Sequence, residues 1–249
     1  MSCPRLHPFR AGGRPLVFAH RGGSAVGPEN TIPAFDQAIA LGVDGLELDV
    51  RLSRDGIVVV HHDARLERTT NASGPVSDWT AGELARVDAA GRFGSAGGHP
   101  GRGLTAGVPT LAEALRRYRD CWMIVEMKDN EPELARATVN EVRQANASER
   151  VCLGGFGLRV VAEARRHGPE IATSAAKEEV RWALYRSWVA WPAAAPAYAG
   201  FQVPECFGKT RVVSERFIRI AHRRDLFVQT WTIDRPEDMH RLLGWGVDG

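Results

Sequence analysis

Short apolar runs and amphipathic stretches alternate along this chain of 249 residues. The apolar runs are typical of buried β-strands and lie at 16–20, 45–50, 57–61, 121–127, 151–156, 171–174, 201–204 and 226–233, with a ninth beginning at Val247. Between most of them, apolar residues at three- and four-residue spacing predict helices at 31–41, 111–119, 133–144, 158–167, 213–223 and 236–243. This alternation predicts an α/β fold built on a parallel sheet.

Nine candidate strands are one more than an eight-stranded barrel needs, and their spacing identifies the extra one. Only seven residues separate Asp49 from Ile57, and they contain Asp55-Gly56, a strong signal for a tight turn. A parallel crossover needs about a dozen residues, so we expect 45–52 and 57–61 to form an antiparallel hairpin. The other eight strands predict a TIM (β/α)8 barrel, which fits a single domain over residues 1–249.

Three segments depart from this pattern. From about 68 to 107 the periodicity gives way to Gly, Ser, Asp and Pro, which predicts a flexible insertion or a cover for the barrel mouth, with a short capped helix near 77–84. The segment 180–198 carries aromatic residues, for which core packing is the favoured interpretation and an apolar wall facing a substrate the alternative. These residues are Trp182, Tyr185, Trp188, Trp191 and Tyr198. The last strand is cut short at Gly249, so either the sequence is truncated or the barrel closes with an unusually short eighth strand, and an open edge there would threaten stability and solubility.

The bulk composition narrows the classes of partner and compartment. A formal net charge of +2 is far too small for a nucleic-acid-binding surface. The four cysteines, Cys3, Cys121, Cys152 and Cys206, lack paired zinc spacing or a disulfide framework, so a reducing cytoplasm is the simpler expectation. No apolar run is long enough for a signal peptide or a membrane span, and no stable membrane insertion is expected. The oligomeric state is not determined by these features.

Two carboxylates two residues apart, Glu47 and Asp49, give the sequence its most specific chemistry. On a strand both side chains share one face, and the apolar residues between and beside them make that face the barrel interior. Glu126 ends a separate strand and offers a third oxygen ligand. Three inward carboxylates need a cation, and hard oxygen ligands favour Mg²⁺ or Ca²⁺. The alternative is a buried structural ion pair with Arg21 or Lys128.

Histidines and basic residues follow the same strand ends. His20 and His62 could divide acid and base roles between an attacking hydroxyl and a departing alkoxide, which suits phosphodiester cleavage. Arg21 offers a planar fork for two phosphate oxygens, and Lys128 offers a point charge. In the segment Glu29-Asn30, Asn30 is expected to act as the N-cap of the first helix.

The order of these motifs resembles the glycerophosphodiester phosphodiesterase family of TIM-barrel enzymes over residues 16–249. The matching motifs are His20-Arg21, Pro28-Glu29-Asn30-Thr31, Glu47-Leu48-Asp49, His62-Asp63, Glu126-Met127-Lys128, Trp231-Thr232 and Gly246-Val247-Asp248-Gly249. The resemblance implies that Glu47, Asp49 and Glu126 are metal ligands and that His20 and His62 are catalytic. It implies that the substrate contacts Arg21, Glu29, Asn30, Lys128 and Trp231. His61 is expected to be a neighbour and not the motif histidine.

Two departures from the family pattern are visible. Gly154-Gly155-Phe156 lacks the serine that commonly precedes this phenylalanine, and the chain ends before the usual last turn. The resemblance implies metal-dependent hydrolysis of a glycerophosphodiester to glycerol 3-phosphate and an alcohol. One alternative is a phospholipase D-like or cyclising action on a longer lipid. The other is a non-catalytic barrel that binds phosphorylated ligands.

Overall fold

The computed structural model describes Phe9 and residues 14–93, 105–189 and 195–249. Its strands are β1 (Phe18–Ala19), β2 (Gly45–Leu52), β3 (Val58–Val60), β4 (Trp122–Met127), β5 (Val151–Gly154), β6 (Ala172–Thr173), β7 (Gly200–Pro204), β8 (Cys206–Phe207), β9 (Thr210–Arg211) and β10 (Phe227–Trp231). Its α-helices are α1 (Ile32–Ala40), α2 (Ala81–Leu84), α3 (Leu111–Arg117), α4 (Pro132–Gln144), α5 (Leu158–His167), α6 (Lys177–Val189), α7 (Glu215–His222) and α8 (Pro236–Trp245). Two short 3₁₀ turns are η1 (His20–Gly22) and η2 (Val76–Asp78).

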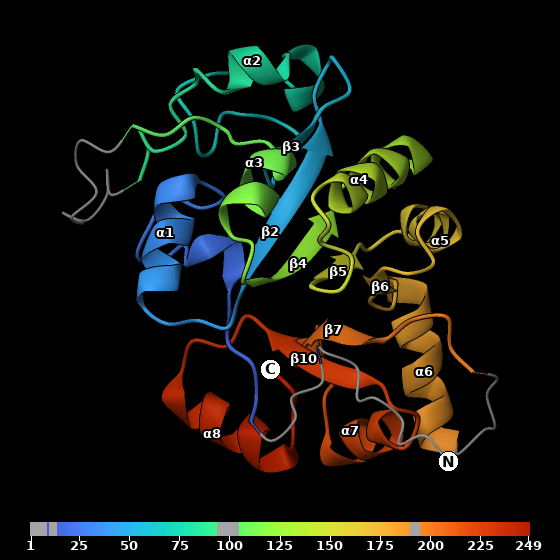
Figure 1. Cartoon of the computed structure of the whole chain (residues 1–249). Helices are drawn as coiled ribbons and strands as arrows, with labels where there is room; N and C mark the ends of the chain where they lie inside the picture. Colours follow the sequence, from blue (N-terminus) through green and yellow to red (C-terminus); the bar gives the residue numbers. More distant parts are fainter. Residues whose placement is uncertain (1–8, 10–13, 94–104, 190–194) are drawn as a thin grey trace.

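The strands form the parallel α/β arrangement that the sequence predicts (Figure 1). One sheet runs in the order β1-β2-β4-β5-β6, and β7 pairs in parallel with β10. A single parallel bridge between Ser174 and Gly200 links the end of β6 to β7. The β8–β9 hairpin, which the sequence analysis did not predict, follows β7 directly.

The predicted antiparallel hairpin is confirmed. Strand β3 returns antiparallel along β2, with Val60 opposite Val50. Gly56 occupies the turn with a φ of 75°, a conformation that glycine adopts without strain. Hydrogen bonding continues past the hairpin, because the His61 amide donates to the Asp49 carbonyl at 2.9 Å.

Of the two alternatives for the end of the chain, the hydrogen bonds of its last residues support a short eighth strand and not an open edge. The Asp248 amide donates to the Val228 carbonyl of β10 at 2.8 Å, and the Gly249 carbonyl accepts from Thr230 at 3.0 Å. On the other side, the Leu16 amide, just before β1, donates to the Asp248 carbonyl at 2.8 Å. Residues 247–249 therefore occupy the place of an eighth strand, bonded on both sides.

Apolar side chains pack between the strands and the helices outside them. One core joins β2, β4 and β5 to α1, α3, α4 and α5, and a second joins β7 and β10 to α7 and α8. Among the described residues, no helix is long and apolar enough to cross a bilayer.

The insertion predicted at 68–107 has a small core of its own where the structure describes it. Leu66, Val76 and Leu84 are buried against Val59 of the hairpin. The predicted short capped helix is α2, where the Thr80 hydroxyl and the Glu83 carboxylate form a capping box. Residues 94–104, which hold several of the glycines behind the expected flexibility, lie outside the described residues.

The expectation of core packing is wrong for two aromatic residues of the segment 180–198. Trp182 and Tyr185 of α6 are 56% and 53% exposed. Tyr198 is half-buried and contacts the ring of Phe201 edge-to-face at 5.2 Å. The side chains of Trp188 and Trp191 lie outside the described part of the chain.

Candidate active site

Strand β2 presents two carboxylates to the barrel interior. Leu46, Leu48 and Val50 are fully buried in the core between the sheet and the helices. Because side chains alternate along a strand, Glu47 and Asp49 point to the opposite, inner face. Asp49 is 1% exposed, so its charge is almost completely withdrawn from water.

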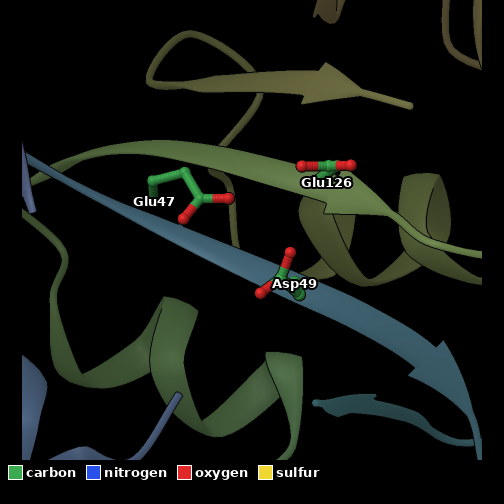
Figure 2. Close-up of side chains that lie close together, drawn as sticks. All are labelled: Glu47, Asp49 and Glu126. Atoms are coloured by element: carbon green, nitrogen blue, oxygen red, sulfur yellow. The ribbon is translucent and has the colours of Figure 1, made fainter. Parts of the chain in front are cut away.

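Strand β4 supplies the third carboxylate, as the sequence predicts. Glu126 is the register partner of Asp49 across the parallel β2–β4 pair. One oxygen from each of Glu47, Asp49 and Glu126 can be chosen so that all lie within 4.8 Å of one another. Figure 2 shows the three side chains grouped on the neighbouring strands β2 and β4. Such a group of oxygen donors could hold a hard divalent cation.

Basic side chains also reach this cluster. The Lys128 ammonium lies 3.0 Å from Glu126 and 3.4 Å from Asp49, and the Arg21 Nε lies 3.3 Å from Asp49. The ion pairs considered as an alternative in the sequence analysis are therefore present. Glu47 has no such close pair: among the described residues, its nearest ion-pair contact is to His20 Nε2, at 3.9 Å.

The electrostatics favour an additional positive charge at the cluster. Burial, together with the charges of Asp49 and Glu126, raises the pKa of Glu47 well above its usual range. Burial also raises the pKa of Glu126, although the Lys128 charge opposes this shift. Carboxylates with raised pKa values in a small space are expected to ionise fully when a divalent cation lies among them. The donor set therefore fits such an ion.

The turn after β1 places Arg21 beside the carboxylates. Arg21 has a φ of 53°, within η1, and its amide donates to Glu47 at 2.9 Å while its guanidinium donates to Glu29 at 3.2 Å. Gly22 follows with a φ of 81°, and a Cβ there would lie 2.6 Å from the ring of Phe35. The tight turn thus depends on a residue without a side chain.

His20 lies at the carboxyl end of β1, beside the acidic cluster. Its Nε2 is 3.9 Å from a Glu47 oxygen, and its Nδ1 is 3.4 Å from the Thr232 hydroxyl that follows β10. Burial and the neighbouring charge of Arg21 lower the pKa of His20. The imidazole is therefore mainly neutral near pH 7 and able to accept a proton.

His62 is held by a carboxylate on its other side. Its Nδ1 lies 2.5 Å from Asp63, which in turn accepts a hydrogen bond from the Arg68 guanidinium. The same guanidinium donates two bonds to Glu29, at 2.7 and 2.8 Å. Burial would raise the pKa of Asp63, but the bonds from Arg68 and His62 outweigh it and the pKa is lowered. Asp63 is thus a stable anion that orients the His62 ring.

Arg68 is the site residue that the sequence analysis missed. It begins the segment interpreted as an insertion, and it lies 39 residues from Glu29. Two of the carboxylates expected at the site, Glu29 and Asp63, are joined through this one side chain. Nothing in the local pattern distinguishes it from the many other arginines of the chain.

The expected cap at Asn30 is wrong. Thr31 caps α1, since its hydroxyl accepts from the Ala34 amide. Asn30 has a φ of 58° instead, and its side-chain amide donates to the Asp49 carboxylate at 2.8 Å. Its side-chain carbonyl accepts from the Asp49 amide at 3.2 Å. Asn30 therefore fixes the position of Asp49, a role that depends on a contact between separate elements.

Aromatic side chains line the same end of the strands. The rings of Phe156 and Trp231 meet edge-to-face at 6.1 Å, and the Lys128 ammonium lies 5.6 Å from the Phe156 ring centre. Trp231 ends β10 and is 37% exposed. His61 is buried beside the Arg65 carbonyl, at 3.3 Å, as expected for a neighbour of the site.

A family model described as the glycerophosphoryl diester phosphodiesterase family matches residues 20–249. The chain belongs to this family. A glycerophosphodiester phosphodiesterase of Caldanaerobacter subterraneus is 32% identical over 241 residues, which cover 94% of this chain and 92% of that protein. A second relative, a probable glycerophosphodiester phosphodiesterase of Mycobacterium tuberculosis, is 30% identical and covers 99% of this chain and 89% of its own length.

Solved structures of the family share the fold. A glycerophosphoryl diester phosphodiesterase domain from Mycobacterium tuberculosis aligns with a TM-score of 0.82 at 24% identity, covering 95% of this chain and 94% of that one. A phosphodiesterase of Oleispira antarctica, solved with its product sn-glycerol-3-phosphate, aligns with a TM-score of 0.76 at 26% identity, covering 94% and 91%. The TIM-barrel fold class predicted from the motifs is confirmed.

Proposed function

We propose that this chain hydrolyses glycerophosphodiesters to glycerol 3-phosphate and an alcohol in the presence of a divalent cation. The observation that carries the proposal is the convergence of Glu47, Asp49 and Glu126 beside two histidines at one end of the strands. The glycerol 3-phosphate found in the Oleispira relative supports the substrate class.

The proposed binding step uses the basic residues of the site. Arg21 and Lys128 already lie within 3.3 and 3.4 Å of Asp49, so their cationic groups face the same space as the carboxylates. They would hold two phosphoryl oxygens and stabilise the charge that grows on them. Mg²⁺ or Ca²⁺ bound by Glu47, Asp49 and Glu126 would add Lewis-acid stabilisation of that charge.

The proposed proton transfers divide between the two histidines. His20, with its lowered pKa, suits the base that takes a proton from the attacking hydroxyl. His62 suits the acid that protonates the departing alkoxide, because the contact of its Nδ1 with the Asp63 carboxylate at 2.5 Å fixes the orientation of the ring. The attacking hydroxyl belongs either to water or to the glycerol 2-position, and the second route forms a cyclic phosphate before hydrolysis. Phosphorus NMR of the reaction distinguishes the two routes.

The aromatic pair and Glu29 complete the proposed substrate surface. Phe156 and Trp231 would flank the glycerol or alcohol carbons, since both rings are partly exposed at the mouth. Glu29 is held by Arg21 and Arg68, so we assign it to the orientation of Arg21.

A product assay tests this proposal directly. Purified protein is treated with a chelator, then given glycerophosphocholine or glycerophosphoethanolamine with no cation, Mg²⁺ or Ca²⁺. We expect glycerol 3-phosphate only when a cation is present, and we expect E126Q to need a higher cation concentration for the same rate. Turnover of lysolipid micelles but not of the soluble diesters would favour the lipid alternative. Binding of both diesters without any turnover would favour a non-catalytic barrel.

A further inference from the structure

Arginines without a polar partner concentrate on two helices of the outer wall. Most arginine side chains in the described part of the chain bond to a carboxylate or a backbone carbonyl. Seven make no hydrogen bond or ion pair with another described residue, and five of these lie on α6, on α7 or directly after α7. The five are Arg181, Arg186, Arg219, Arg223 and Arg224, all exposed. The other two are Arg116 and Arg159, on separate helices.

A groove between α6 and α7 gathers four of the five. It has a volume of about 880 Å³, and Arg186, Arg219, Arg223 and Arg224 line it. Among the described residues of that lining, Glu179 is the one carboxylate, and it is already paired with Arg165 at 2.7 Å. The groove therefore carries a strong positive charge, although the net charge of the whole chain is only +2.

Exposed aromatic side chains adjoin this basic groove. Trp182 lines it and is 56% exposed, while Tyr185 lies outside the lining and is 53% exposed. The two rings meet edge-to-face at 6.3 Å. Tryptophan and tyrosine beside arginine are typical of protein surfaces at the headgroup level of a bilayer. A small soluble anion confined to the groove would not account for the exposure of Tyr185.

Helix polarity explains only part of the cluster. Arg186 and Arg219 lie in the last turns of α6 and α7, where a cation interacts favourably with the helix dipole. That effect is confined to the last turn, and it does not require Arg181, Trp182 or Tyr185. The acidic residues of both helices, Glu178, Glu179 and Glu215, lie in their first turns.

We propose that α6 and α7 form a docking surface for an anionic lipid bilayer. In this arrangement the arginines face lipid phosphates, and Trp182 and Tyr185 lie at the headgroup level. Figure 1 shows both helices beside β7 and β10, whereas the acidic cluster lies on β2 and β4. Docking is therefore separate from catalysis, and the proposal stands or falls independently of the proposed reaction.

Vesicle sedimentation of the full chain tests the proposal. The vesicles contain phosphatidylcholine alone or with about one-third phosphatidylglycerol, at low and high salt. We expect binding to the anionic vesicles at low salt, and loss of that binding at high salt. The double variant R219Q/R223Q should weaken binding about 25-fold, since each arginine near the surface contributes about fivefold. Adding W182S to this double variant should weaken the binding to anionic vesicles further.

The matched control is R116Q/R159Q, which removes the same charge from other helices. It should retain binding within about twofold, and both double variants should retain turnover of the soluble diester. Equal loss of binding in the two double variants would overturn the proposal, as would equal binding to neutral vesicles. Saturable binding of tripolyphosphate without vesicle binding would also overturn it and would assign the groove to a soluble polyanion.

Discussion

The two ends of the strand interior differ in chemistry although the same strands build both. At one end, the ring of Phe9 lies 5.2 Å from Trp122 and 6.0 Å from Phe227, within an apolar cluster. At the other end, the carboxylates of Asp49 and Glu126 form ion pairs with the Lys128 ammonium. Along the inner face of β4 the side chain changes from aromatic to acidic over four residues. Stability and chemistry are thus separated along the length of one strand.

Two glycines at the aromatic end leave room for large rings. A Cβ at Gly45 would lie 2.4 Å from the ring of Phe18, and a Cβ at Gly200 would lie 2.3 Å from the ring of Phe227. Large rings therefore fill the space that two glycines leave. At the polar end, hydrogen bonds and ion pairs hold the side chains instead, so their positions respond to charge and pH.

Substitution of a catalytic histidine should have the largest effect, and this effect should be on turnover. We expect H20A or H62A to lower turnover by about two to four powers of ten, because proton transfer contributes that range. The cation dissociation constant should change little. In contrast, E47A or E126A should weaken cation binding, with partial rescue of the rate by excess cation. Steady-state kinetics and calorimetric cation titration measure both quantities. Histidine variants that lose the cation while carboxylate variants keep it would invert these assignments.

The same truncation at the two ends should separate stability from chemistry. F227A removes a fully buried ring, so we expect it to lower the free energy of unfolding by about 3–5 kcal/mol. F156A removes a ring that is 48% exposed at the mouth, so we expect a change within about 0.5 kcal/mol and a raised KM. Urea unfolding and diester kinetics of both variants check this contrast. Similar destabilisation by the two truncations would contradict it.

Loss of the bonds by which Arg68 joins Glu29 to Asp63 should have the smallest effect, a decrease in stability that depends on pH. Although burial of Glu29 and Asp63 opposes the shift, Arg68 and its neighbours lower the pKa of both carboxyls. Their contribution to stability is therefore complete above the ordinary carboxyl pKa and is lost as the pH falls through the lower folded-state pKa. At neutral pH, R68Q should cost about 1 kcal/mol, because the Arg68 side chain is 47% exposed and solvent screens its ion pairs.

Urea unfolding at a series of pH values measures this effect. The difference between the wild-type protein and R68Q should shrink on acidification below the ordinary carboxyl pKa of about 4. The variant R68K serves as the control, since it keeps the charge but loses the planar fork, and it should fall between the two. A difference that stays constant from neutral to acidic pH would contradict the proposed role of Arg68.

The sequence by itself determined the features that depend on short-range geometry. The alternation of side chains along a strand placed Glu47 and Asp49 on one face, and the short interval around Asp55-Gly56 allowed only a hairpin. Helix α5 begins and ends at the residues that its apolar spacing predicts. These features could be predicted because each follows from the dihedral angles of a few adjacent residues.

Only the tertiary structure decided which distant groups meet. Asn30 holds Asp49 instead of capping α1, and Arg68 reaches Glu29 across 39 residues. The side chains of Trp182 and Tyr185 are exposed, although the same helical spacing would suit a core. The physical reason is that the packing of strands and helices against one another sets the distances between side chains that are far apart in the sequence. A local pattern gives the face on which a residue lies, but it does not give the partner on the opposite side.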